Sequence, residues 1–134
     1  MTLEKKQRQV IITRMTANGI ISYSRGLHPN EAILILRGKA TCEQVTVDGL
    51  AIPPFASSGP YYSGFSDFFL PFDSSYVGTA HSHPSRSNKP SLEDLNMGFY
   101  GTVSIIIAYP YEDDTMAAYD RAGNELEIKI LNST

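Results

Sequence analysis

The chain has 134 residues, the length of one domain of ordinary size, and we expect a single domain over residues 1–134. Hydrophobic residues make up 42% and charged residues 19%, which is typical of a chain that folds around a core and not of a disordered one. A formal net charge of −3 argues against a broad nucleic-acid-binding face or a polybasic membrane anchor. The longest apolar runs fall far short of the about 20 residues that a membrane span needs, so we expect a soluble, cytoplasmic protein.

The first elements expected after a flexible polar tail (residues 1–7) are a strand and a helix. Val, Ile and Thr side chains predict the strand over residues 9–14. Apolar side chains at helical spacing predict the helix over residues 16–27, with Thr16 as its N-cap. His28-Pro29 ends this helix, because the residue before a proline avoids helical angles.

Strands and loops dominate the middle of the chain. A nearly all-apolar run predicts a buried strand over residues 31–38, and weak alternation predicts a more exposed strand over residues 42–50. Residues 51–64 are rich in Pro, Gly, Ser and Tyr, which indicates a long loop. Aromatic residues predict a strand over residues 65–72, and another strand is expected over residues 76–80.

The last third of the chain adds a helix and the closing strands. A Ser-Leu-Glu-Asp start after a proline predicts a helix over residues 91–100. Residues 105–107 predict a core strand, and residues 116–119 and 126–131 predict a closing hairpin. Two helices placed between about seven strands indicate an α/β fold, a single domain built on a mixed β-sheet with two main helices.

Two histidines at the end of the strand predicted over residues 76–80 give the first sign of chemistry. Side chains at i and i+2 of a strand point to the same face, so His81 and His83 can converge on one ion. Asp94 falls in the first turn of the second predicted helix and can bring a carboxylate to the same ion. Two nitrogen ligands and one oxygen ligand suit Zn²⁺, and they leave a fourth position for water, as in catalytic zinc sites.

A zinc hydrolase also needs a base for the attacking water and a donor for the oxyanion. Ser91 lies three residues before Asp94 and therefore shares its side of a helix. Glu31 stands at the start of the predicted core strand, where a carboxylate is costly unless it is paired or functional. The spacing alone leaves open whether Glu31 reaches the metal or is a capped or salt-bridged carboxylate, for example with Arg37 or Lys39.

The pattern of these residues is similar to a known family signature. His81-Ser-His-Pro, six residues, Ser91, two residues and Asp94 resemble the JAMM (MPN-plus) metalloprotease signature His-Ser/Thr-His-Pro-x6-Ser-x2-Asp at every specified position. His28-Pro-x-Glu31, followed by apolar residues and Gly38, resembles the family's catalytic-glutamate strand. Residues 76–81 and 105–110 are similar to strands of archaeal members, so the resemblance covers roughly residues 10–131. It implies a cytidine-deaminase-like JAMM/MPN fold.

The resemblance also implies a role for each residue of the signature. His81, His83 and Asp94 would bind one Zn²⁺ per chain. Glu31 would activate the attacking water and pass its proton to the leaving amine, and Ser91 would stabilise the oxyanion. The implied reaction hydrolyses the amide bond between the C-terminus of ubiquitin, or a ubiquitin-like protein, and a target amine, as in a deubiquitinase.

The implied partner is a ubiquitin-like modifier with its conjugates, whose extended tail needs a place to bind. The aromatic strand predicted over residues 65–72 could pair with such a tail by strand addition, with Phe65, Ser66 and Phe68 as the candidate edge. The chain departs from the family in having Leu34 where glycine is frequent, which we interpret as a packing change. Its length is close to that of the minimal domain, without the long insertions that eukaryotic relatives use to select a linkage.

Three other functions stay open at this point. The same chemistry could act on adducts of sulfur-carrier proteins or on peptides. A non-catalytic scaffold that binds a ubiquitin-like partner is a second alternative, although scaffolds of the family lack the metal ligands that this chain keeps. A metal phosphoesterase could also use His and Asp, but such sites usually hold two metals, and the sequence offers ligands for one.

Cys42 and His28 each allow a structural and a functional interpretation. Cys42 is predicted to be a small buried hydrophobic residue and not a nucleophile, since no second catalytic histidine pattern accompanies it. As the single cysteine, it excludes an internal disulfide and a Cys-rich zinc finger. His28 is predicted to be a helix-end residue and not a fourth metal ligand.

Overall fold

The computed structural model describes residues 7–53, 57–58, 63–64, 73–90 and 101–132. Its main sheet contains β1 (Gln9–Ile12), β2 (Ile33–Ala40), β3 (Gln44–Ala51), β6 (Tyr76–His83), β7 (Val103–Ala108), β8 (Met116–Tyr119), β9 (Glu125–Leu126) and β10 (Ile128–Ile130). Within these residues the strand order is β10-β1-β3-β2-β6-β7-β8-β9. β1 is parallel to β3 and to β10, and β6 is parallel to β7, while the other neighbours are antiparallel, so the predicted mixed sheet is confirmed.

Two predicted elements fall outside the described residues. These are the strand over residues 65–72, with the candidate edge Phe65, Ser66 and Phe68, and the helix over residues 91–100, with Ser91 and Asp94. The two short strands β4 (Ser57–Ser58) and β5 (Ser63–Gly64) pair with each other inside the segment predicted as a loop.

The one α-helix in the described part of the chain is α1 (Arg14–Leu27), and it begins earlier than predicted. Its N-cap is Thr13 and not Thr16, because the Thr13 Oγ1 accepts a hydrogen bond from the Thr16 backbone N–H at 3.3 Å. Thr13 is held in the extended conformation that an N-cap needs, since its own N–H donates to the Val47 carbonyl of β3. No described helix is long and apolar enough to cross a bilayer.

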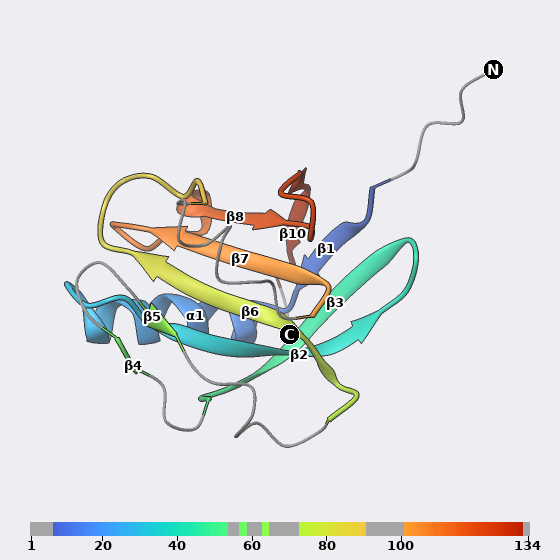
Figure 1. The fold of residues 1–134 in the computed structure, drawn as a ribbon, viewed down its shortest axis with the longest axis horizontal. Coiled ribbons are helices and arrows are strands. Elements are labelled where there is room, and N and C mark those ends of the chain that lie inside the picture. The colour runs from blue at the N-terminus through green and yellow to red at the C-terminus, as the bar shows by residue number, and fades with distance from the viewer. Residues whose placement is uncertain (1–6, 54–56, 59–62, 65–72, 91–100, 133–134) are drawn as a thin grey trace.

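α1 covers one face of the sheet, behind β2 and β6 in the view of Figure 1. Its buried residues recur at helical spacing and form the stripe that meets the sheet: Thr16, Ala17, Ile20 and Ser24. The main hydrophobic core contains Ala17 and Ile20 together with buried strand residues such as Leu34, Val45 and Ile105. β3 lies between β1 and β2, and its burial alternates as predicted, with Val45 and Val47 fully enclosed and the other residues of the strand more exposed.

The predicted closing hairpin is half correct. β8 pairs with β9 in antiparallel register, as expected, but β10 leaves this edge and pairs in parallel with β1. This pairing packs the half-buried Ile128 and Ile130 against the main core, which a simple hairpin would not do. Only Glu127 separates β9 from β10, although they lie at opposite ends of the strand order, so the sheet curls until its edges come close (Figure 1).

Gly78 of β6 marks a close approach to β7 and supplies a stability test. A Cβ atom at this position would lie 1.8 Å from the Val103 carbonyl oxygen, so the two strands would have to separate. We expect Gly78→Ala to lower the free energy of unfolding by about 2 kcal/mol or more, measured by urea denaturation. Gly26→Ala is the matched control, because a Cβ atom there meets nothing within 4 Å. In a helix it should raise stability by up to about 1 kcal/mol. Equal stability of the two variants would contradict the close approach.

Candidate metal centre

His81 and His83 end strand β6 on the sheet face opposite α1. His81 is in register with Ile33 of β2 and Ile106 of β7, and paired residues of neighbouring strands share a face. Ile106 belongs to a small buried cluster with Ala117 and Tyr119, separate from the main core against α1. Both histidines are more than nine-tenths buried, so the end of β6 presents two imidazoles to an enclosed space.

The spacing of the two rings fits a shared tetrahedral ion. Their centroids lie 5.1 Å apart, and the ring planes are inclined by 52°. Two imidazoles bound through nitrogen to one zinc ion at about 2.0–2.1 Å would have centroids roughly 5 Å apart. His81 and His83 therefore meet the first geometric requirement of the zinc site expected from the sequence.

The loop after β6 fixes the tautomer of His83. The Nδ1 atom lies 3.0 Å from the backbone carbonyl oxygen of Ser87, which can only accept a hydrogen bond. In the neutral imidazole Nδ1 therefore carries the proton, and Nε2 keeps the lone pair that a metal needs. A backbone carbonyl behind a ligating histidine is a recurrent feature of metal sites. The Nε2 atom of His81 is itself shielded from solvent.

The third expected ligand, Asp94, and the oxyanion donor expected at Ser91 lie outside the described residues. Among the residues that are described, no group of three His, Cys, Asp or Glu side chains is placed to hold a metal ion. The geometry of the candidate centre thus rests on the two histidines and on what surrounds them.

The pairing of β2 with β6 places Glu31 at the end of the sheet that carries the histidines. Beyond the paired Ile33 and His81, the Ser82 N–H donates to the Ala32 carbonyl at 3.0 Å. The Ala32 N–H donates in turn to the buried Ser82 hydroxyl at 2.8 Å. Glu31 precedes Ala32 and therefore lies at the same end of the sheet as His83. Its side chain is about nine-tenths buried there.

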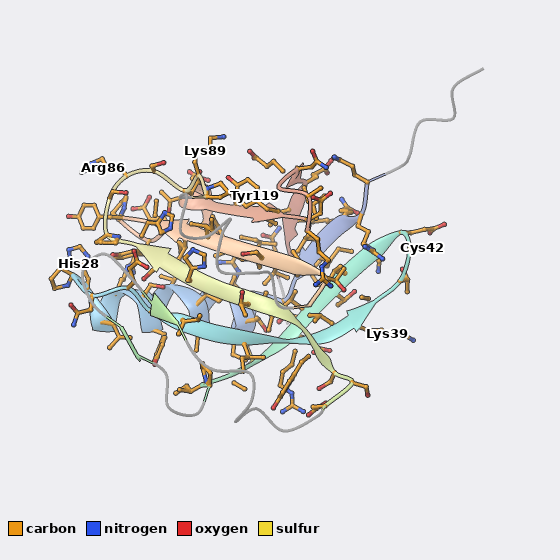
Figure 2. All side chains as sticks on the ribbon, viewed as in Figure 1. His28, Lys39, Cys42, Arg86, Lys89 and Tyr119 are labelled. Atoms are coloured by element: carbon orange, nitrogen blue, oxygen red, sulfur yellow. The ribbon has the colours of Figure 1, made fainter. Side chains whose placement is uncertain are left out.

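Arg37 and Lys39 do not form the ion pairs with Glu31 that the sequence allowed. Arg37 lies further along β2, where its guanidinium is 3.4 Å from a carboxylate oxygen of Asp73. Figure 2 shows Lys39 at the opposite end of the molecule from His28, which precedes Glu31 by three residues. The ion pairs with Arg37 and Lys39 are therefore not formed.

Cys42 is exposed, and the prediction that it is buried is wrong. It belongs to the turn between β2 and β3, because β3 begins two residues later than the predicted strand. Figure 2 places it, like Lys39, at the end of the molecule far from His28. Its distance from the histidines agrees with the expectation that it is not the nucleophile.

An aromatic cluster that the sequence analysis did not single out borders the candidate centre. The Tyr109 N–H donates to the carbonyl oxygens of His83 and Ser85, both at 3.0 Å, so the turn after β7 lies against the end of β6. The Tyr109 ring stacks on His28 with centroids 5.0 Å apart, and the Arg86 guanidinium lies over its ring. Figure 2 shows His28 and Arg86 at the same end of the molecule. The only sequence signal was a pair of tyrosines around a proline directly after a core strand.

His28 is the residue that ends α1, as predicted. Its backbone N–H donates to the Ser24 carbonyl at 3.1 Å, which closes the last turn of the helix. Its Nδ1 atom lies 2.6 Å from the Tyr111 hydroxyl oxygen. Burial raises the pKa of Tyr111, with smaller contributions from Tyr109 and from the charge of Glu31. The Tyr111 hydroxyl therefore keeps its proton at neutral pH and forms a hydrogen bond with His28.

Comparison with families of known proteins gives one clear match. The family model described as prokaryotic homologues of the JAB domain matches residues 13–122 of this chain. A protein of Haloferax volcanii named "Probable metalloprotease" is 31% identical over 140 residues, which cover 99% of this chain and 86% of the relative.

Solved structures of similar proteins share the fold. A structure described as "JAMM: A Metalloprotease-like Zinc Site in the Proteasome and Signalosome" is 29% identical, with a TM-score of 0.68, and the match covers 92% of this chain and 99% of that one. A JAB1/MPN domain protein from Archaeoglobus fulgidus is 33% identical, with a TM-score of 0.67 and coverage of 90% and 98%. A protein from Desulfitobacterium hafniense, 18% identical with a TM-score of 0.68 over 92% and 93% of the two chains, is similar in fold alone.

Proposed function

This chain belongs to the family of prokaryotic homologues of the JAB domain, and we propose that it is a zinc-dependent metalloprotease that acts as an isopeptidase. The observation that carries the proposal is the pair of buried imidazoles of His81 and His83, at the ring spacing of a shared zinc ion, with the buried Glu31 at the same end of the sheet. The Haloferax volcanii relative, named a probable metalloprotease, supports the reaction class.

We propose that His81, His83 and Asp94 hold one zinc ion per chain. The ion supplies Lewis acidity, which polarises a carbonyl group and lowers the pKa of a water molecule. His83 is prepared for this role, because Ser87 keeps its proton on Nδ1 and leaves Nε2 to the metal. The enclosure of both imidazoles favours a tightly held ligand pair over a surface site.

Glu31 is the proposed general base. Its carboxylate takes a proton from the attacking water and later gives that proton to the leaving amine, which completes the hydrolysis of the amide bond. Ser91 donates a hydrogen bond to the oxygen that becomes negative in the tetrahedral intermediate. The pairing of Ala32 with Ser82 supports this assignment, because it holds the residue next to Glu31 firmly against β6.

The proposed substrate is the amide bond between the C-terminus of ubiquitin, or a ubiquitin-like modifier, and a target amine. An extended tail could bind as an added strand, and Phe65, Ser66 and Phe68 are the proposed edge. Adducts of sulfur-carrier proteins and ordinary peptides are the alternatives within the same chemistry. We favour the isopeptide because the signature around His81 is that of a family of isopeptidases.

A paired cleavage assay tests this proposal. Purified protein is offered a ubiquitin-like protein linked to a lysine side chain, and separately the same protein fused linearly to a peptide. We expect cleavage of the isopeptide conjugate, its loss with a chelator, and its return when Zn²⁺ is added back. Faster cleavage of the linear fusion would favour the peptidase alternative. Cleavage that a chelator leaves unchanged would contradict a zinc-dependent reaction.

A further inference from the structure

Tyr111 has an unusual backbone for a large buried residue. Its φ angle is +63°, in the left-handed region, and its side chain is 1% exposed. A bulky residue seldom adopts this conformation, and it persists only where the surrounding structure holds it in place. The Tyr111 N–H donates to the Ala108 carbonyl at 2.8 Å, so the chain turns sharply after β7 and directs the tyrosine back into the protein.

The turn gives the Tyr111 hydroxyl one well-defined partner. Its oxygen lies 2.6 Å from Nδ1 of His28, and the two rings meet edge to face with centroids 5.4 Å apart. His28 also stacks on Tyr109, which completes a three-ring cluster between the end of β7 and the end of α1. The hydrogen bond thus ties two elements that are distant in the sequence.

The hydrogen bond between Tyr111 and His28 constrains the segment that carries the proposed base, Glu31. Glu31 follows His28 by three residues. The Asn30 N–H donates to the Leu27 carbonyl at 2.8 Å, so the chain forms a turn between α1 and Glu31. After Glu31, Ala32 is fixed by its two hydrogen bonds with Ser82. Residues 28–32 are therefore anchored on both sides of Glu31.

We propose that Tyr111 is a positioning residue that, through its hydrogen bond to His28, fixes the segment carrying Glu31 in front of the two histidines of β6. The inference rests on the proposed function, in which Glu31 is the base. Tyr111 itself takes no part in the reaction. Tyr111 anchors the chain before Glu31 through His28, just as Ser82 anchors the chain after Glu31 through Ala32. A base held on both sides needs less reorganisation to reach its productive geometry.

Tyr111→Phe tests the proposal, because it removes the hydroxyl and keeps the ring. We expect kcat to fall by about 10- to 100-fold, the effect of a small misplacement, while KM and zinc content stay at wild-type values. Hydrogen exchange of peptides covering residues 28–33 should become faster, and exchange elsewhere should not. His28→Ala removes the same bond from its exposed partner and should have the same two effects. The double variant should be no slower than the slower single variant.

Two control variants separate positioning from stability. Tyr109→Phe makes the same chemical change in the same cluster, without touching the hydroxyl that bonds His28, and should keep wild-type kcat. Ile12→Val weakens the fold in the core at β1, where Ile12 pairs with Val47 and Ile130, and should leave the exchange of residues 28–31 unchanged.

The outcomes distinguish this inference from the proposed function. Wild-type kcat and wild-type exchange in Tyr111→Phe would overturn the positioning role. A fall in kcat without faster exchange at residues 28–33 would overturn it as well, since Tyr111 would then act directly. Faster exchange in a protein whose wild type cleaves no isopeptide would support the anchor and contradict the proposed function.

Discussion

Replacement of Glu31 by glutamine should reduce hydrolysis by about 10²- to 10⁴-fold, the range by which a positioned general base accelerates a reaction. Glutamine has the size and shape of glutamate but cannot accept a proton at neutral pH. Glu31 is about nine-tenths buried, and the Ser82 hydroxyl holds the neighbouring Ala32 in place. The substitution should therefore leave the packing intact. We expect zinc content and thermal stability near those of the wild type, measured beside steady-state cleavage of an isopeptide conjugate.

Glu43→Gln provides the matched control for this experiment. It makes the same chemical change at an exposed carboxylate in the turn between β2 and β3, away from the histidines. Its cleavage rate should equal that of the wild type. If Glu31→Gln cleaves as fast as Glu43→Gln, Glu31 is not the base. If Glu31→Gln loses its zinc, Glu31 contributes to metal binding and the assigned role is wrong.

The sequence predicts the main sheet well because its signals are local. The apolar run before Gly38 and the triple isoleucine at residues 105–107 become the central strands β2 and β7. The family signature predicts the neighbourhood of His81 and His83 for a similar reason, since the period of a strand puts both side chains on one face. Membership of the JAB-domain family confirms the resemblance that the signature carries.

The expectations that the structure corrects depend on contacts between distant segments. Thr13 replaces Thr16 as the N-cap because the Val47 carbonyl of β3 holds its backbone extended. β10 leaves the predicted hairpin because β1 offers a parallel edge beside the core. The local sequence pattern contains no information on either distant partner, the Val47 carbonyl for Thr13 or β1 for β10. Cys42 is exposed because a strand boundary falls two residues later than expected, and such boundaries are the least certain part of a sequence-based assignment.

The position of Glu31 shows the same limit at the candidate site. Its spacing from His81 in the sequence does not reveal that β2 pairs with β6, so the residues alone left its partner open. The register Ile33 to His81, followed by the hydrogen bonds between Ala32 and Ser82, places Glu31 at the end of the sheet that carries the histidines. Tyr111 was missed because its partner His28 is 83 positions away, and no short motif joins the two.

Loss of either β6 histidine should remove the metal. His83→Ala takes away one of three proposed ligands, and changes that only disturb the residues behind a ligand already lower metal affinity by about 10- to 100-fold. We therefore expect the affinity for zinc to fall by well over about 100-fold, with cleavage lost in parallel. The measurement is zinc per chain in protein purified without a histidine tag, beside titration of the metal-free protein with Zn²⁺. His81→Ala should behave in the same way, because both rings are proposed to hold the same ion and their centroids lie 5.1 Å apart.

His28→Ala is the informative control for this loss, because it removes the remaining histidine of the chain. Its Nδ1 is engaged by Tyr111, so it should keep one zinc ion per chain even though the anchor before Glu31 is lost. The two classes of variant then separate: the β6 histidines control metal content, and His28 controls turnover at constant metal content. Zinc retained at wild-type affinity in both His81→Ala and His83→Ala would contradict the metal centre and, with it, the proposed reaction.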